Sequence, residues 1–206
     1  IQRQTTVPTG KPDSVTPSSA EPLKAVPPGV RVAEHRYGDP LVLPEGLFPS
    51  ATERGEFLHR CFQVLLLRPE MARRLFHASG VTISADVESQ ILRSVGAFRD
   101  ALGVLSVVDI RTELPVLSSS SGTIVNGLID LLGTTPNGLF VLDHKSDLVS
   151  SPTQRLPDYL PQLQVYGRSL EAIDGARAPA ILCINWIALG VLSLIEWSST
   201  GSKAAA

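Results

Sequence analysis

The sequence predicts an α/β domain with a central mixed β-sheet flanked by helices. Apolar residues recur at helical spacing up to about residue 102, and the period changes to that of strands from Val104 onward. The segment 122–132 is apolar on both alternating faces, as expected of a central strand. A further helical segment then precedes two last strands. The predicted order is therefore helix, helix, three strands, helix, two strands.

The composition supports one packed domain and excludes several classes of protein. The chain has 206 residues, of which 43% are hydrophobic, and a net charge of −2. These values exclude disorder of the whole chain, which needs low hydrophobicity and high net charge. No run of about 18 apolar residues occurs, so we expect no membrane span and no membrane partner. The small net charge means that any contact with nucleic acid must be local.

The first predicted helix begins at Ser50, where Glu53 follows at capping-box spacing, and it ends or kinks at Pro69. A second helix is predicted over about 84–102. The strands that follow are bounded by Pro115 and by a turn at 136–138. The predicted strands are 104–116, 122–132, 139–146, 180–189 and 191–197, with a helix over 158–174 closed by Gly175 and the last two strands joined at Gly190.

Proline content divides the chain into three predicted parts. Residues 1–45 form a Pro-rich linker or arm, because nine of the 16 prolines lie in the first 50 residues. Residues 46–200 form the folded domain, and residues 201–206 look like a cloning remnant. The linker, together with the missing initial Met, suggests a piece of a larger protein. Cys61 and Cys183 lack metal-ligand spacing, which fits a reducing cytoplasm and two small core residues.

Two aspartates and a lysine come together if two of the predicted strands pair as a hairpin. Residues two apart on a strand share a face, so Asp143 and Lys145 project together while His144 points away. A hairpin centred on the turn at 136–137 pairs residues whose numbers sum to 273, as those of Asp130 and Asp143 do. The two carboxylates are then opposite each other, with Cβ atoms about 4.5–5.5 Å apart, to within a residue or two of register.

Two carboxylates and an ammonium between apolar strands are costly unless something compensates their charge. A divalent cation relieves the repulsion between the carboxylates, and Mg²⁺ prefers such oxygen ligands together with water and phosphate oxygens. Lys145 beside the cation would stabilise charge on a phosphate or activate the attacking water. The alternative interpretation is a structural Asp–Lys pair near a strand end.

At this point the sequence resembles the RecB/AddA-type PD-(D/E)xK nucleases. The resemblance covers about residues 50–197 and rests on five motifs that occur in the family's order. They are Gly55-Glu56-Phe57-Leu58-His59 for G-x-x-x-H, Glu113-Leu114-Pro115 for E-x-P, Gly127-Leu128-Ile129-Asp130 for G-x-x-D, Asp143-His144-Lys145-Ser146 for D-x-K-S, and Gln162-Leu163-Gln164-Val165-Tyr166 for Q-x-x-x-Y.

The resemblance implies a restriction-endonuclease-like core and a role for each matching residue. Asp130 and Asp143 would bind Mg²⁺ or Mn²⁺, together with the backbone carbonyl of His144 and the imidazole of His59. Lys145 would be the catalytic lysine. Further residues would line the site and steady the DNA (Gln162 and Tyr166) or support it (Glu113). Two cysteines cannot hold the iron–sulfur cluster that some relatives carry.

The residues alone leave alternatives open for three of these assignments. His59 lies beside the apolar stripe of the first helix, where a histidine is often structural. Gln162 and Tyr166 share a helix face, which is a commonplace arrangement. Glu113 is also explained as a solvated strand end.

The resemblance implies a metal-dependent deoxyribonuclease that degrades DNA from its ends during double-strand-break repair and recombination. It implies the C-terminal domain of a UvrD/AddA-like helicase. The implied partners are DNA single strands or duplex ends, helicase motor domains and an AddB-like subunit. The location would be cytoplasmic, with the bacterial nucleoid. The alternatives are a stand-alone nuclease of a phage or mobile element, and a DNA-binding or regulatory module without turnover.

Overall fold

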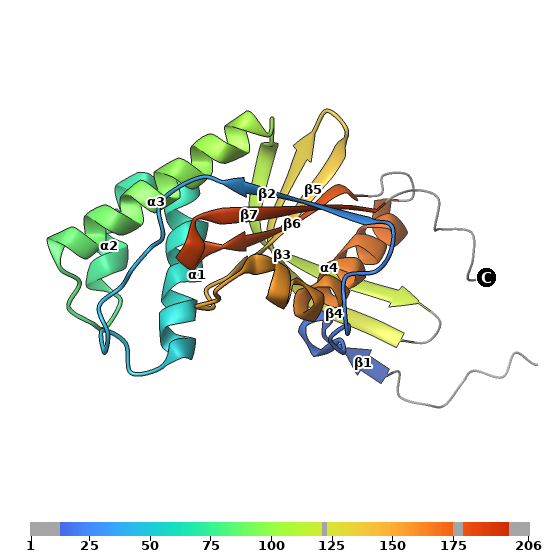
Figure 1. The fold of residues 1–206 in the computed structure, drawn as a ribbon, viewed down its shortest axis with the longest axis horizontal. Coiled ribbons are helices and arrows are strands. Elements are labelled where there is room, and N and C mark those ends of the chain that lie inside the picture. The colour runs from blue at the N-terminus through green and yellow to red at the C-terminus, as the bar shows by residue number, and fades with distance from the viewer. Residues whose placement is uncertain (1–12, 121–122, 175–178, 198–206) are drawn as a thin grey trace, which may run out of the picture.

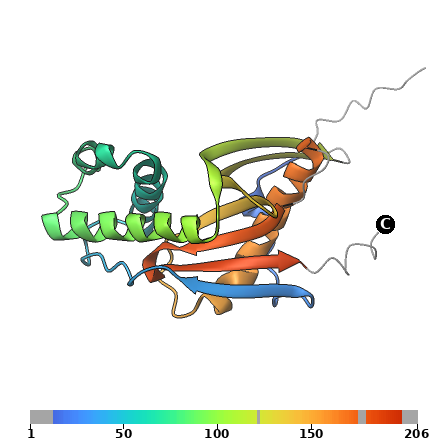
Figure 2. The same cartoon turned by 90° about the horizontal axis from the view of Figure 1, so that it is seen from above.

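A computed structural model describes residues 13–120, 123–174 and 179–197, and it confirms the mixed α/β class. A mixed sheet has α1, α2 and α3 on one side and α4 on the other (Figures 1 and 2). The helices are α1 Ala51–Leu67, α2 Ala72–His77, α3 Ala85–Val104 and α4 Pro152–Asp174, with single 3-10 turns at Pro17–Ser19, Pro69–Met71 and Ile187–Leu189. The strands are β1 Asp13–Val15, β2 Val30–Arg36, β3 Val108–Ser120, β4 Thr123–Thr135, β5 Gly138–Lys145, β6 Pro179–Trp186 and β7 Val191–Trp197.

The strand order is β1-β4-β5-β6-β7-β2, with β3 on the other edge of β4. The pairs β1–β4 and β5–β6 are parallel, and the remaining pairs are antiparallel. The long helix α4 forms the crossover between β5 and β6, as a parallel pair requires. No helix in the described part of the chain is long and apolar enough to cross a membrane.

Two hydrophobic clusters cover the two faces of the sheet. The first joins α1 and α3 to one face of β5 through Phe140 and Leu142. The second joins α4 to the opposite face, where Val141 and Trp186 are fully buried. Successive residues of β5 therefore face different helices.

The two predicted core cysteines, Cys61 and Cys183, are free thiols that are fully buried.

Most predicted elements are present with ends shifted by a few residues. The Ser50 hydroxyl accepts the Glu53 N–H at 3.1 Å and caps α1 as predicted. The last predicted strand matches β7, and Gly190 before it adopts the left-handed φ of 64° that lets the chain turn. The short helix α2 was not predicted. The expected helix stop at Gly175 and the expected cloning remnant at 201–206 lie outside the described residues.

Helix α4 begins six residues before the predicted start and continues through Pro157 and Pro161. A proline lacks the N–H that the helix needs, so Pro161 leaves the carbonyl of Pro157 without its helical partner. The backbone N–H of Leu23 takes this place and donates to that carbonyl at 3.1 Å. A segment far away in the sequence therefore donates the backbone hydrogen bond that the helix lacks where proline interrupts it.

Part of the N-terminal segment that was predicted as a linker or arm pairs with the sheet. Strand β1 pairs with the start of β4, and β2 pairs with β7 along its whole length of seven residues. Figure 1 shows both strands against the body of the domain. Two stretches of this segment, 13–15 and 30–36, thus contribute to the sheet, because tertiary pairing outweighs a composition rich in proline.

Candidate active site

The predicted hairpin register is confirmed. Leu131 pairs with Leu142 and Thr135 with Gly138, and each pair of residue numbers sums to 273. The ladder between β4 and β5 ends at the Leu131–Leu142 pair, one position before Asp130 and Asp143. The backbone N–H of His144 donates to Asp130 Oδ2 at 2.7 Å. The Asp130 side chain therefore joins the two strands beyond the last ladder pair.

The site occupies a gap along one edge of β4. This edge pairs with β1 at residues 123–125 and with β5 at residues 131–135, and the stretch between them has neither strand as a neighbour. The Tyr166 hydroxyl, from α4, donates to the carbonyl of Leu128 in this stretch at 2.6 Å. Asp130 lies at the end of the gap, where β5 diverges from β4.

Strands β3 and β4 change face together at this point. On β4, Ile129 packs with the cluster under α4, whereas Leu131 packs with the cluster under α1 and α3, although residues two apart normally share a face. The residue of β3 at the matching position is Glu113, which adopts a left-handed φ of 54°. This coordinated kink gives Asp130 its position at the gap.

Lys145 and Asp143 form a buried ion pair on the α4 side of β5. The Lys145 ammonium lies 2.7 Å from Asp143 Oδ2, and their side chains are 17% and 4% exposed. Gln162 on α4 contacts both residues. Its amide nitrogen donates to Asp143 Oδ1 at 2.8 Å, and its amide oxygen accepts from Lys145 at 3.1 Å. The amide nitrogen also lies 3.2 Å from the Tyr166 hydroxyl.

The electrostatics of the site favour the protonated form of Asp130. Burial, followed by the charge of Asp143, raises the pKa of Asp130 to about 7. Burial acts to lower the pKa of Lys145, but the charge and hydrogen bond of Asp143 outweigh it and raise this pKa. Lys145 is therefore an ammonium at neutral pH in this arrangement. The pKa of Glu113 is raised by burial.

His59 lies on the other side of Asp130. Its Nδ1 is 3.8 Å from Asp130 Oδ2, and burial lowers the pKa of the imidazole, so that the ring is neutral and able to bind a metal ion. Gly55, one turn earlier on α1, lies so close to the end of β5 that a Cβ atom there would be 2.7 Å from the hydroxyl oxygen of Ser146, the residue after this strand. The predicted close approach of α1 to the sheet is confirmed.

His144 points away from the two carboxylates, as predicted. Its buried ring packs among His59, Phe62 and Phe98 under the helices on the opposite face. Its Nδ1 lies 2.9 Å from the side-chain amide nitrogen of Asn185, which donates to it. Nε2 then carries the proton, because a neutral imidazole has one donor and one acceptor nitrogen.

The carboxylates of Asp130 and Asp143 are the kind of ligand that a divalent cation prefers, although their side chains do not point toward one common position. Carboxylate oxygens are the ligands that Mg²⁺ prefers, and a cation would offset the charge that raises the pKa of Asp130. Across residues 13–120, 123–174 and 179–197, no three His, Cys, Asp or Glu side chains form a group placed to hold a metal ion. The oxygens of Asp143 face Lys145 and Gln162 instead. Binding a cation thus requires the two carboxylates to turn toward a common point.

The sequence patterns missed Tyr159 and Asp147. The Lys145 ammonium lies over the Tyr159 ring, 4.4 Å from its centroid, and the Tyr159 hydroxyl donates to Asp147. The spacing of both residues from the motif residues in the sequence could have identified them. Tyr159 stands three before Gln162 on a helix, and Asp147 stands two after Lys145 along the chain.

The raised pKa of Asp130 predicts that stability falls as pH increases. The pKa is about 7 in the folded state against an ordinary value of 3.8, so the folded state holds the proton more tightly. The stabilisation is fully present below about pH 4, is lost as pH rises through about 7, and amounts to at most about 4 kcal/mol. Urea denaturation of wild type and Asp130→Asn from pH 4.5 to 8 checks this. A difference between the two proteins that stays constant over this range would contradict it.

The left-handed backbone of Glu113 predicts that glycine is better tolerated there than alanine. A residue with a Cβ atom is strained by about 1–2 kcal/mol in this conformation, and glycine avoids this strain. Glycine also has more conformational entropy in the unfolded chain, which lowers the stability of the folded protein by about 0.5–1 kcal/mol. Glu113→Gly is therefore expected to be more stable than Glu113→Ala by about 0.5–1 kcal/mol. Thermal and urea melts of the pair measure the difference. Equal stability of the two variants would show that the kink carries no strain.

Comparison with known proteins finds a local match in sequence. No family model matches the chain. A stretch of 60 residues is 38% identical to an ATP-dependent helicase/nuclease subunit of Carboxydothermus hydrogenoformans, and it covers 28% of this chain and 5% of that protein. The crystal structure of SSO0001 aligns with 71% of this chain and 67% of its own, at 15% identity and a TM-score of 0.32, below the level that indicates a shared fold. The chain is thus locally similar to a helicase/nuclease subunit, and the match spans about a twentieth of the length of that protein.

Proposed function

We propose that this chain is a PD-(D/E)xK nuclease domain that hydrolyses phosphodiester bonds of DNA with the help of Mg²⁺ or Mn²⁺. The observation that carries the proposal is the arrangement at the β4–β5 divergence. Asp130 and Asp143 come from adjacent strands, and Lys145 lies 2.7 Å from Asp143 at the edge of the gap. The local similarity to a helicase-nuclease subunit supports the same class of activity.

Asp130 and Asp143 would hold the cation, with His59 and the carbonyl of His144 as further ligands. The bound cation would supply positive charge for the phosphate and lower the pKa of a water molecule. Lys145, protonated beside Asp143, stabilises negative charge that develops on the phosphate oxygens. Gln162 fixes the distance between Lys145 and Asp143 because it bonds to both. The Tyr166 hydroxyl anchors α4 to β4.

We further propose that the domain processes DNA ends as an exonuclease in double-strand-break repair, joined to helicase motor domains and paired with an AddB-like subunit. The support is the helicase-nuclease similarity. A stand-alone nuclease would have no such motor in its full-length protein, so the complete gene product distinguishes the two.

Digestion of end-labelled linear DNA, single-stranded and duplex, with Mg²⁺ or Mn²⁺ tests the activity. Wild type is expected to shorten the DNA, and Lys145→Ala is expected to be slower by about 100-fold or more. Lys24→Ala is the matched control, because Lys24 is exposed and lies outside the site. Intact DNA with wild type, or equal rates for wild type and Lys145→Ala, would favour a binding module without turnover.

A further inference from the structure

The N-terminal segment 16–23, here called the strap, is fixed against the candidate site at both of its ends. Pro17 is buried, and a Cβ atom on Gly127 of the G-x-x-D motif would be 2.6 Å from its ring. The same Cβ atom would be 3.1 Å from the Tyr166 ring, so Gly127 gives room to both residues. At the other end Leu23 donates to Pro157 of α4 at 3.1 Å and packs against the cluster under that helix.

A hollow of about 590 Å³ lies between the strap and α4, and it reaches the candidate catalytic lysine. Lys145 and Gln162, the two groups that contact Asp143, form part of its lining. Exposed Ser18 and Ser19 line it from the strap. The volume lies within the range of about 300–1,000 Å³ that pockets for single small ligands have. Such a space is large enough for one nucleotide of an unpaired strand.

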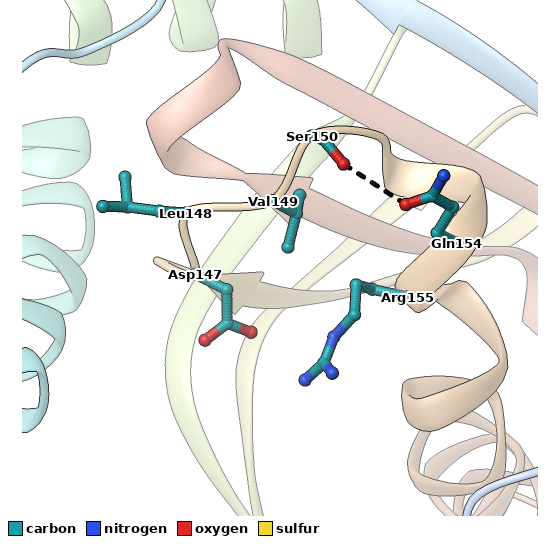
Figure 3. Close-up of a pocket in the computed structure, with 6 residues that line it drawn as sticks. All are labelled: Asp147, Leu148, Val149, Ser150, Gln154 and Arg155. Carbon is teal, nitrogen blue, oxygen red and sulfur yellow. Dashed lines mark hydrogen bonds between the residues drawn. The ribbon is translucent and has the colours of Figure 1, made fainter.

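Arg155 provides a cation beside the hollow. Its guanidinium lies 3.2 Å from Asp158 and 5.9 Å from the centroid of the Tyr159 ring, and these contacts hold the side chain on the α4 side of the hollow. It also lines a second hollow of about 340 Å³ formed with residues 147–150. In Figure 3 the Arg155 and Asp147 side chains extend toward the same opening. Glu21 and Asp158 add carboxylates to the lining of the first hollow. The charge of Asp158 is compensated by its ion pair with Arg155.

We propose that this hollow binds the nucleotide next to the scissile phosphate in an unpaired DNA strand. The nucleotide's base contacts the strap around Ser18 and its far phosphate contacts Arg155. This inference rests on the proposed nuclease function, because it places the nucleotide beside Lys145. In this proposal the strap, whose composition predicted a linker, forms the wall of the site that separates single strands from duplex.

Equilibrium binding of a fluorescein-labelled oligothymidylate tests the proposal, with Ca²⁺ in place of Mg²⁺ to avoid cleavage. Ser18→Leu adds bulk to the hollow without an aromatic ring on which a base could stack, and it is expected to weaken binding of the single strand about tenfold, with a less than about twofold effect on a blunt duplex. Ser89→Leu adds the same bulk at an exposed position of α3 and is expected to bind as wild type does. Circular dichroism melts confirm that both variants fold.

The salt dependence of binding tests the phosphate contact separately. Loss of one phosphate contact lowers the slope of log K against log salt concentration by about 0.7 for a single strand, and we expect this change in Arg155→Ala. Arg168→Ala removes an exposed arginine further along α4 and should keep the wild-type slope. Unchanged single-strand affinity in Ser18→Leu together with an unchanged slope in Arg155→Ala would overturn the proposal. Because binding is measured without hydrolysis, this result is distinct from a failure of the nuclease function.

Discussion

Asp143→Asn is expected to reduce DNA cleavage by about 100- to 1,000-fold. Asparagine has nearly the shape of aspartate, so its side-chain oxygen still accepts the hydrogen bond from Gln162 that Asp143 Oδ1 accepts at 2.8 Å. The substitution removes the negative charge that the proposed cation and Lys145 share. The loss of activity thus reports on charge rather than on shape.

The same substitution has a cost in stability that must be separated from its effect on catalysis. Asp143 is 3% exposed, and loss of its charge leaves the Lys145 ammonium buried without its ion-pair partner. The free energy of unfolding is expected to fall by up to about 3 kcal/mol. Urea denaturation at the assay temperature establishes that the variant is folded when cleavage is measured.

Rates of cleavage of end-labelled DNA at saturating Mg²⁺, for folded Asp143→Asn and wild type, provide the measurement. Asp100→Asn, at an exposed position of α3, is the matched control and should retain wild-type rates. Activity of Asp143→Asn within about threefold of wild type would count against a metal-binding role, since loss of a direct ligand costs far more than that.

Lys145→Arg is expected to lose cleavage by about 100-fold although the positive charge remains. The ammonium lies 2.7 Å from Asp143, 3.1 Å from Gln162 and 4.4 Å from the centroid of the Tyr159 ring. A planar guanidinium is larger and directs its donors differently, so it cannot occupy this position without displacing one of these neighbours.

Single-turnover cleavage by Lys145→Arg, with Lys24→Arg as control, measures the effect. Lys24 is exposed, so the control makes the same chemical change away from the site. Wild-type cleavage by Lys145→Arg would show that any cation suffices there. It would contradict the role in which the ammonium contacts one phosphate oxygen at a fixed position.

The hairpin that carries the two aspartates was predictable because local signals define it. The turn at 136–137 sets the pairing, and the period of two then fixes which residues face each other. For this reason the residue pattern alone gives the register of the hairpin and puts His144 on the far side, whereas Asp130 and Asp143 lie just beyond the last ladder pair, where the strands diverge. The roles of these residues stay predictions.

The kink at Glu113 and the path of α4 were not predictable, because both depend on distant partners. Glutamate has no preference for the left-handed backbone, so nothing in the sequence marks the change of face at Asp130. Proline normally ends a helix, and α4 continues past Pro161 because Leu23 satisfies the carbonyl of Pro157. The strap that supplies this contact lies in a segment whose composition indicated a linker.

The pairing of β2 with β7 has a practical consequence for where the chain can be cut. Strand β7 has β6 on one side and β2 on the other. A shorter protein that begins at residue 46 would keep β7 but lose its outer neighbour. Its open edge would carry unpaired N–H and C=O groups beside apolar residues, a template for edge-to-edge aggregation. Size-exclusion chromatography is expected to show such a truncated protein as oligomers, and recovery of a stable monomer would show that β2 is dispensable.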